Sequence, residues 1–333
     1  MPRPAAGRRA PPPAKRRPRS PLVLAGAAAL AVAAAVGVAV LLLRGRGPER
    51  PRFDGAAALA LVEKQVTFGP RVPNSEGHAQ LLRFLQEYLK PRADSLAVEE
   101  FQHVVLQGDT LRMANVIASF RPQAASRVML ATHWDTRPVA EKDADAARRT
   151  QPIPGANDGG SGTAVLLALA DVLADNPLPE GYGVDLVFLD GEDYGHDPQT
   201  LAPLESDMYL GAREFARAHA GYRPLFGVLL DMVGDRDADF QQEGHSLDAV
   251  PEIVRRVWAA ADELGYGDVF RRQLLGYITD DHVFLNQAGI RTMDLIDFDY
   301  AYWHTHEDTP ANVSAKTLGM VGDVLIELLY KRL

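Results

Sequence analysis

Side chains that can bind a metal ion follow apolar runs at five places in the chain. These side chains are His133, Asp135, Asp158, Glu192, Asp193, Asp231 and His304. Imidazole and carboxylate groups are ligands of catalytic zinc, and separate strands of an α/β sheet can bring them to one point. The chain contains no cysteine, so thiolate ligands are excluded. The ordered set therefore predicts a zinc site held by nitrogen and oxygen atoms alone.

The most informative single segment is the acidic one that follows the strand-like run Val184–Leu189. Asp190, Glu192 and Asp193 place three carboxylates within four residues. Buried together they would repel one another and lose their hydration, and a bound cation removes that cost. One carboxylate can bind the metal while its neighbour acts as a general acid or base. A solvated acidic loop is the alternative, which we disfavour because the strand directs this segment to the edge of the sheet.

Two other segments have two readings each when they are taken alone. His133 and Asp135 are two residues apart after an apolar run, a spacing that suits a metal ligand and a carboxylate that orients it. For this segment taken alone, we favour the alternative that they are a polar pair in a loop. Asp158 lies in the glycine-rich stretch Pro154–Gly162, where a strand would turn into a helix. It could bind a metal or cap that helix through backbone N–H groups.

The last candidates lie in the second half of the chain. Asp231 closes an apolar strand, and His304 follows an aromatic run, with His306 and His282 as competitors for a ligand role. The segment Asp280–His282 precedes a helical turn. It could hydrogen-bond to the metal ligands, as Asp135 could, or it could be a plain helix cap.

Short continuous apolar runs alternate with helical patterns, which predicts a mostly parallel sheet covered on both faces. The predicted strands are Val128–Thr132, Val184–Asp190, Leu225–Asp231 and Ile290–Ile296. The predicted helices are Ser161–Ala174, Met208–Ala220, Leu247–Leu264 and Ser314–Leu333, and a further helix capped by Asn74 or Ser75. Two earlier strands, Val98–Leu106 and Met113–Phe120, flank a turn at Gly108 and predict an antiparallel hairpin. The fold class is therefore α/β with a mixed, mostly parallel central sheet flanked by helices on both faces.

The N-terminal region predicts a membrane anchor. Residues 1–20 form a basic segment of disordered composition, and Pro21–Leu43 is an uncharged run of 23 residues. As a helix this run would be about 34 Å long, enough to cross a bilayer core of about 30 Å. A cleaved signal peptide is the alternative, but the run is too long for its apolar part. We expect a signal anchor at 21–43, a linker at 44–53 and one extracytoplasmic catalytic domain at 54–333, with the N-terminus inside.

The charge distribution argues against a nucleic-acid partner. The net charge of -9 divides into 11 basic residues and one acid in residues 1–52, and 24 basic and 43 acidic residues in the remainder. Binding to a phosphate backbone requires a basic surface, and the globular part is strongly acidic.

With these residues assembled, the chain resembles the zinc-dependent aminopeptidase superfamily. Within it, the chain is most similar to the type II (animal-type) glutaminyl cyclases, including their bacterial members, from about Val66 to Leu333. The segments that carry the resemblance are FGPRVPNSEGH, THWDTRP, PGANDGGSG, DLVFLDGEDYG, LLDMVGD, ITDDHVFLNQAGI and WHTHEDTP. The resemblance implies a zinc aminopeptidase-like fold. It also implies a glutaminyl-peptide cyclotransferase that converts the N-terminal glutamine of peptides or proteins to pyroglutamate and releases ammonia.

The resemblance also implies roles for individual residues. The single zinc of the cyclases would be held by Asp158, Asp193 and His304. Glu192 would be the catalytic acid and base, Asp231 and Asp280 would be its relay carboxylates, and Trp303 would line the pocket. The aminopeptidase relatives use a second zinc, which would be held by His133 and Asp231 with Asp158 as the bridge. The cyclases commonly carry a tryptophan in the loop after the paired acids, where this chain has Met208 and Tyr209.

Two other functions compete with the cyclase. In a two-zinc aminopeptidase, Glu192 would activate a bridging water and N-terminal residues would be hydrolysed. A non-catalytic, membrane-tethered binding domain is the third hypothesis, and metal loading without turnover on either substrate class would support it. The segment Asp280–His282 and the pair Trp303–His304 resemble the cyclases more than the peptidases, so the cyclase with one zinc ion is the leading hypothesis.

Overall fold

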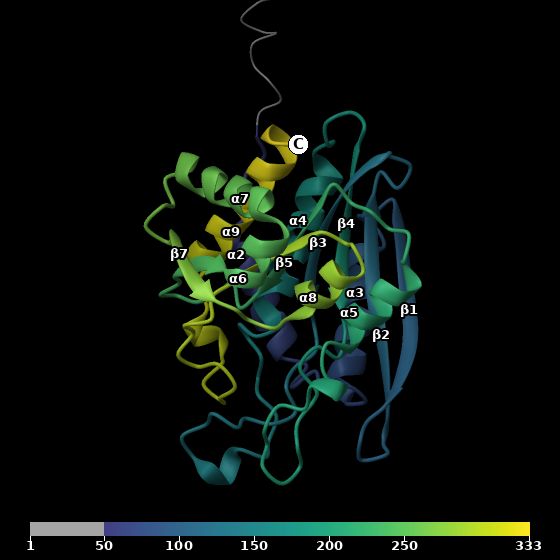
Figure 1. The fold of residues 1–333 in the computed structure, drawn as a ribbon, viewed down its shortest axis with the longest axis vertical. Coiled ribbons are helices and arrows are strands. Elements are labelled where there is room, and N and C mark those ends of the chain that lie inside the picture. The colour runs from purple at the N-terminus through teal and green to yellow at the C-terminus, as the bar shows by residue number, and fades with distance from the viewer. Residues whose placement is uncertain (1–49) are drawn as a thin grey trace, which may run out of the picture. The chain divides into compact units, whose positions relative to one another are not determined.

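A six-stranded sheet runs through the part of the chain that the computed structural model describes, residues 50–333 (Figure 1). Its strand order is β1-β2-β4-β3-β5-β8. The strands are β1 (Ser95–Val104), β2 (Thr110–Phe120), β3 (Ser126–His133), β4 (Tyr182–Leu189), β5 (Phe226–Asp231) and β8 (Thr292–Ile296). The neighbours from β4 through β3 and β5 to β8 are parallel, whereas β1 and β2, and β2 and β4, are antiparallel. The predicted mixed sheet is confirmed, and its strand ends differ from the prediction by at most three residues.

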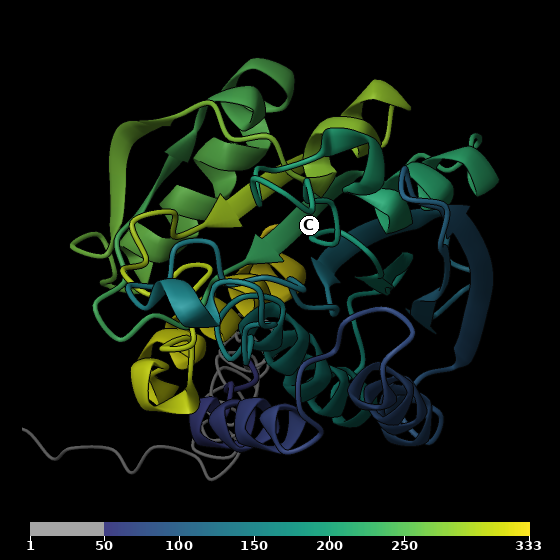
Figure 2. The same ribbon diagram turned by 90° about the horizontal axis from the view of Figure 1, so that it is seen from below.

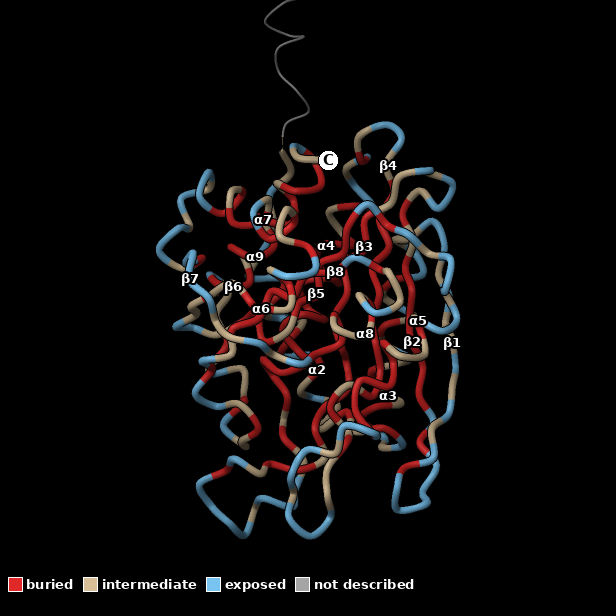
Figure 3. The backbone as a smooth tube through the Cα atoms, in the orientation of Figure 1, coloured by how far each residue is buried: buried red, intermediate tan, exposed pale blue. Residues whose placement is uncertain are grey.

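Helices cover both faces of this sheet, as predicted (Figure 2). The helices are α2 (Gly55–Val66), α3 (Glu76–Leu89), α4 (Gly160–Asp175), α5 (Leu210–Ala218), α6 (Gly244–Ala249), α7 (Pro251–Glu263), α8 (Asp281–Gln287) and α9 (Ala315–Lys331). Alternate residues of each central strand belong to different cores. In β3, Val128 and Leu130 pack on the side of α4 and α9, while Met129 and Ala131 pack on the side of α5 and α8. Burial on both faces explains why these strands read as continuous apolar runs (Figure 3).

Helix ends follow the residues that cap them. The side chain of Ser75 accepts a hydrogen bond from the backbone N–H of His78, which confirms the predicted cap of α3, a contact of about 1 kcal/mol. Ser314 caps α9 in the same way.

The single helix predicted at Leu247–Leu264 is wrong, because two helices, α6 and α7, occupy this stretch. Pro251 disfavours a helical conformation for the residue before it, and Val250 accordingly has φ -143° and ψ 50°.

Several elements were not predicted. A second sheet contains two parallel strands, β6 (Phe240–Glu243) and β7 (Phe270–Gly276). Helix α8 was predicted only as a helical turn next to Asp280–His282. Helix α2 was not predicted, nor were three short 3-10 turns. These turns are Ala146–Arg148, Glu205–Asp207 and Pro310–Asn312.

The predicted basic segment, the predicted anchor at 21–43 and residues 44–49 lie outside the described residues. Residues 50–53 of the predicted linker lie within them: Arg50 forms an ion pair with Asp323, and Phe53 packs against Gly322. Among residues 50–333, no helix is both long and apolar enough to cross a membrane.

Candidate active site

The carboxyl ends of the parallel strands place the predicted ligands at one edge of the sheet. His133 is the last residue of β3 and Asp231 the last of β5, and Glu192 and Asp193 follow the end of β4. Asp158 precedes α4, which starts at Gly160. Parallel strands end at the same edge of the sheet, so residues that follow the ends of these strands lie close together.

One group of possible ligands contains Asp158, Asp193 and His304, whose ligand atoms all lie within 4.8 Å of one another. His304 Nε2 lies 3.1 Å from Asp193 Oδ2 and 3.6 Å from Asp158 Oδ2. Those two carboxylate oxygens are buried and have no hydrogen-bond partner. A buried set of one imidazole and two carboxylates with unpaired oxygens fits a zinc ion.

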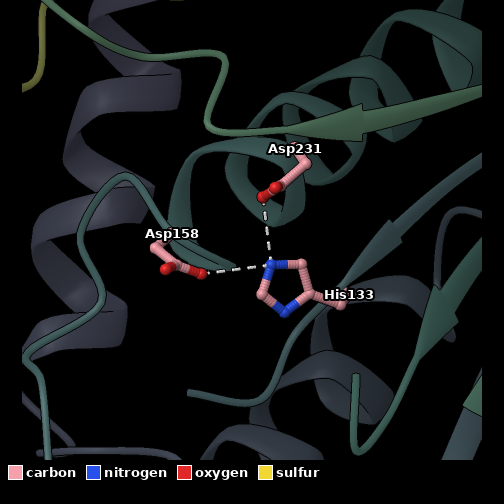
Figure 4. A group of neighbouring side chains, drawn as sticks. All are labelled: His133, Asp158 and Asp231. Carbon is pink, nitrogen blue, oxygen red and sulfur yellow. Dashed lines mark hydrogen bonds and ion pairs between the residues drawn. The ribbon is translucent and has the colours of Figure 1, made fainter. Parts of the chain in front are cut away.

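A second group contains His133, Asp158 and Asp231 (Figure 4). His133 Nε2 lies 3.3 Å from Asp158 Oδ1 and 3.1 Å from Asp231 Oδ1. Asp158 belongs to both groups, so the structure forms the ligand sets for one zinc and for two.

His304 is held by residues that the sequence analysis missed. Its Nδ1 lies 2.6 Å from Glu141 Oε1, and the same Glu141 accepts a hydrogen bond from Arg137 Nε at 2.9 Å. Arg137 is fully buried and also donates through Nη1 to Asp193 Oδ1 at 2.8 Å. A carboxylate on the far nitrogen of a histidine fixes the ring and leaves the other nitrogen free for a metal. Glu141 and Arg137 therefore orient two of the three ligands in the first group.

These contacts also set protonation. Burial opposes charge on Asp193, but His304 and Arg137 outweigh it and lower the pKa of Asp193 to about 2. Burial opposes charge on His304 as well, but Asp193 and Glu141 raise its pKa to about 9. Burial raises the pKa of Asp158, and the neighbouring Asp193 adds to that effect.

The loop that carries Asp158 is fixed from both sides. Asp308 accepts hydrogen bonds from the backbone N–H of Asn157 at 2.8 Å and of Asp158 at 3.2 Å. Arg71 Nη2 donates to the carbonyl of Gly155 at 2.5 Å. Both Arg71 and Asp308 are completely buried and lie in motifs noted above without an assigned role.

Gly159 in this loop has φ +71°, and a Cβ there would lie 2.4 Å from the carbonyl oxygen of Asp135. Only glycine fits this position.

Glu192 and Asp193 share a fixed backbone. Asp135 accepts the N–H of Glu192 at 3.1 Å and that of Asp193 at 3.3 Å. Asp135 was expected to orient His133, and it lies 3.5 Å from His133 Nδ1, but its hydrogen bonds go to the acidic loop. Asp190 points elsewhere, to His78 and the N–H of Ala114.

The Glu192 side chain makes no hydrogen bond in the described part of the chain. Burial, reinforced by Asp193, raises the pKa of Glu192 well above its ordinary value.

The side chains of the segment Asp280–His282 lie in two different surroundings. Asp280 caps α8, accepting the N–H of Asp281, and lines the same cavity as Glu192 and Asp231. Burial and the nearby Asp231 raise the pKa of Asp280 well above its ordinary value.

Asp281 and His282 were expected to hydrogen-bond to the metal ligands. Instead, Asp281 is buried with both carboxylate oxygens unpartnered, and His282 Nε2 lies 3.0 Å from Glu243. His306, the other competitor, is bound to Asp143.

A cavity of about 340 Å³ opens beside these carboxylates. Its apolar wall is formed by Met208, Tyr209, Met232, Ile278, Phe298 and Trp303. The ring of Trp303 lies 4.2 Å from the His304 ring, and the Tyr209 hydroxyl donates to the carbonyl of Thr279. Tyr209, Met232 and His304 all have positive φ values, and strained backbone of this kind clusters at functional sites. The predicted pocket residues Met208, Tyr209 and Trp303 therefore do line the cavity that contains Glu192.

Comparison with known protein families shows which family has this fold and site. Residues 115–329 match the model of peptidase family M28. The protein belongs to this family. The family model spans the strand ends and loops that carry all the ligand groups described above, so the M28 fold and the candidate site coincide.

Solved structures similar to this M28 protein are named for two different activities. A glutaminyl cyclase of Bacteroides thetaiotaomicron bound to N-acetylhistamine is 38% identical, with a TM-score of 0.81, covering 85% of this chain and 99% of that one. A leucine aminopeptidase precursor of Bacteroides thetaiotaomicron is also 38% identical, with the same TM-score and coverage. Among curated proteins, the glutaminyl-peptide cyclotransferase-like protein of Bos taurus is 25% identical over 290 residues, which are 79% of this chain and 72% of the relative.

Proposed function

We propose that this protein is a zinc-dependent glutaminyl-peptide cyclotransferase of the type II kind. The observation that carries the proposal is the position of Glu192, a half-buried carboxylate of raised pKa beside a complete ligand group in a cavity with an apolar wall. A carboxylate in such a place suits proton transfer between two amines. Relatives named glutaminyl cyclase or glutaminyl-peptide cyclotransferase support the choice of substrate.

The reaction forms one bond and breaks another within the substrate. The α-amine nitrogen of the N-terminal glutamine attacks its own side-chain amide carbon, and the bond from that carbon to the amide nitrogen breaks. One proton moves from the α-amine to the departing ammonia, and no water is consumed. Glu192 is placed to accept that proton and return it, and its raised pKa brings it closer to the pKa range useful near neutral pH.

The residues around Glu192 have two other roles, metal binding and the exclusion of water. Asp158, Asp193 and His304 would hold a zinc ion, which would supply Lewis acidity toward the side-chain carbonyl of the substrate. Trp303 and its apolar neighbours exclude water from the cavity, which disfavours hydrolysis.

Asp231 and Asp280 line the same cavity, and their mutual repulsion must be offset by a proton or a cation. If a proton between the two carboxylates serves this purpose, Asp231 is unavailable as a ligand and the second zinc is not held.

A two-zinc aminopeptidase is the second candidate function. The observation that favours it is the second ligand group, in which His133 and Asp231 close on the shared Asp158. In that reaction Glu192 would accept a proton from an attacking water rather than from an amine. The similarity to the leucine aminopeptidase precursor supports it as well.

The test compares the two reactions on the same preparation. Glutaminyl peptides are assayed for ammonia and pyroglutamyl product, and leucyl peptides for released leucine. The number of zinc ions in the cavity is the difference in zinc content between the wild type and Asp158→Ala, because Asp158 serves both ligand groups. Cyclisation with a difference of about one zinc supports the proposal. Faster cleavage of leucyl peptides with a difference of about two contradicts it.

A further inference from the structure

A set of unpartnered polar atoms lies behind the cavity wall, where Asp280, His282 and Asp294 meet. Asp280 Oδ2, His282 Nδ1 and both carboxylate oxygens of Asp294 are buried without a hydrogen-bond partner. These side chains belong to residues that are 4%, 0% and 1% exposed. One ligand atom from each lies within 4.8 Å of the other two. We call these three residues the buried cluster.

The orientation of His282 is set by Glu243. Glu243 accepts hydrogen bonds from the N–H groups of His245, Ser246 and Ile278, from the Ser246 hydroxyl and from His282 Nε2. Four of these five donors belong to residues other than His282, and they favour the ionised form of the Glu243 carboxylate. An ionised carboxylate only accepts hydrogen bonds, so Nε2 of His282 carries the proton. The free lone pair on Nδ1 is therefore available, and Asp294 Oδ2 lies 3.8 Å away.

This arrangement is the one that proteins use for histidines that bind metals, in which a carboxylate holds the far nitrogen of the ring. The same Ser246 hydroxyl that donates to Glu243 accepts the backbone N–H of Asp294 at 2.9 Å. The frame that holds His282 thus also holds the strand that carries Asp294.

No lysine or arginine among residues 50–333 balances the charges of the two carboxylates in the buried cluster. Neither Asp280 nor Asp294 forms an ion pair with a lysine or arginine within residues 50–333. Burying unpaired carboxylates is costly unless a proton or a cation compensates them. A single proton can join only two of the four unpartnered atoms, whereas a metal ion can bind one atom from each of the three residues.

We propose that Asp280, His282 and Asp294 hold a divalent transition-metal cation such as zinc, at a closed site separate from the catalytic ligands. The imidazole nitrogen favours zinc over magnesium or calcium, which prefer oxygen alone. Three ligand atoms, one from each buried side chain, suit a zinc ion enclosed by the protein. The ion ties the start of α8 to β8 and, through Glu243, to α6, and it holds Asp280 in place at the cavity wall.

The first experiment counts zinc in the full chain after dialysis against a chelator. Asp158→Ala disables both catalytic ligand groups, so zinc that stays bound belongs elsewhere. We expect about one zinc per chain in Asp158→Ala and none in Asp158→Ala combined with His282→Gln. The matched control is His245→Gln, a neighbouring histidine whose ring centre lies 6.3 Å from that of His282, which should keep the ion.

Two results overturn the proposal: Asp158→Ala without bound zinc, or zinc that survives His282→Gln. If Asp158→Ala does not fold, the wild type is compared with His282→Gln alone, and the expected loss is one zinc. This count does not depend on the proposed cyclisation, because it is read without substrate.

The second experiment measures whether the Tm falls or rises when Asp294 is replaced. Asp294→Asn keeps the shape of the side chain but removes its charge. With a bound ion, the variant should lose zinc and its Tm should fall by about 5 °C or more, because the binding free energy is lost. Without an ion, removing a buried unpaired carboxylate leaves the Tm unchanged or raises it, and that result overturns the proposal.

Discussion

Glu192 and Asp193 are adjacent acids that the structure places in opposite environments. Asp193 is paired with Arg137 and His304, which lower its pKa to about 2 and keep it ionised as a ligand. Glu192 has no arginine or lysine partner among residues 50–333 and lies 3.9 Å from His133 Nδ1, and burial raises its pKa well above its ordinary value. The buried guanidinium of Arg137 therefore distinguishes Asp193, a metal ligand, from Glu192, a base. The order of the two acids in the sequence does not reveal this difference.

Replacing these two acids should have different effects. Glu192→Gln should keep zinc and lower turnover by about a hundredfold or more, the range for removal of an acid–base group. Asp193→Ala should lose the catalytic zinc, because it removes one of three protein ligands. Zinc content and turnover are measured on both variants. Loss of zinc in Glu192→Gln together with its retention in Asp193→Ala would reverse the assignment.

Glu141 should affect metal binding without touching the metal. Glu141→Gln weakens the contact to His304 Nδ1, and changes of this kind lower metal affinity by about 10- to 100-fold. Affinity is measured by competition with a chromogenic chelator. Glu307→Gln is the matched control, an exposed glutamate of the neighbouring loop. Equal affinities in the two variants would show that Glu141 does not orient the ligand.

The sequence predicted the ligands that follow strand ends, because an apolar run and the residue after it are neighbours in the chain. It did not predict the residues that hold those ligands. Glu141 reaches His304 across 163 positions and Asp308 reaches Asp158 across 150, so only the folded chain brings them together. Glu243 beside His282 was missed for the same reason.

Whole elements were predictable where burial is two-sided. The central strands β3, β4 and β5 are buried almost throughout, so hydrophobicity alone marks them. Strand β7 is mostly exposed and β6 is only four residues long, which leaves no comparable pattern. The break between α6 and α7 was marked by Pro251, but the apolar periodicity continues across it.

Asp297 directly follows the last residue of β8, and its negative charge destabilises the folded state. Burial, with Asp235 nearby, raises the pKa of Asp297 to about 7, above its ordinary value of 3.8. The folded state then binds the proton more tightly, so stability present below the ordinary pKa is lost as pH rises through 7. Asp297→Asn removes this loss. Relative to the wild type, its free energy of unfolding should be higher by about 2–4 kcal/mol at pH 8 and should gain little at pH 4.

Urea unfolding at the two pH values measures this difference, with the exposed Asp299→Asn as the control. A benefit that is the same at pH 4 and pH 8 would show that Asp297 does not titrate between them.

The molecule as a whole combines an acidic catalytic part with a basic, apolar N-terminal region. The uncharged run at 21–43 and its basic flank still predict a membrane anchor. The full chain should sediment with membranes and resist carbonate extraction, whereas a chain that begins at Arg50 should stay in the supernatant. Recovery of the full-length gene product as a shorter species in the supernatant would instead indicate a cleaved signal.

The junction between the two regions determines where a shortened chain can begin. Arg50 Nη1 lies 3.2 Å from Asp323 and donates to its backbone carbonyl at 3.0 Å. The ring of Phe53 fills the space over Gly322, where a Cβ would lie 2.2 Å from it. A chain that begins at Asp54 keeps the cap of α2 but loses both contacts.

The chain that begins at Asp54 loses the contacts of a half-buried phenylalanine and a partly exposed ion pair. Its free energy of unfolding should therefore be about 1–3 kcal/mol lower than that of a chain that begins at Arg50. Urea unfolding measures it. Within the longer chain, Phe53→Ala should reproduce most of the loss, while the exposed Arg52→Ala should not. Equal stability of the two shortened chains would mean that residues 50–53 serve only as a linker.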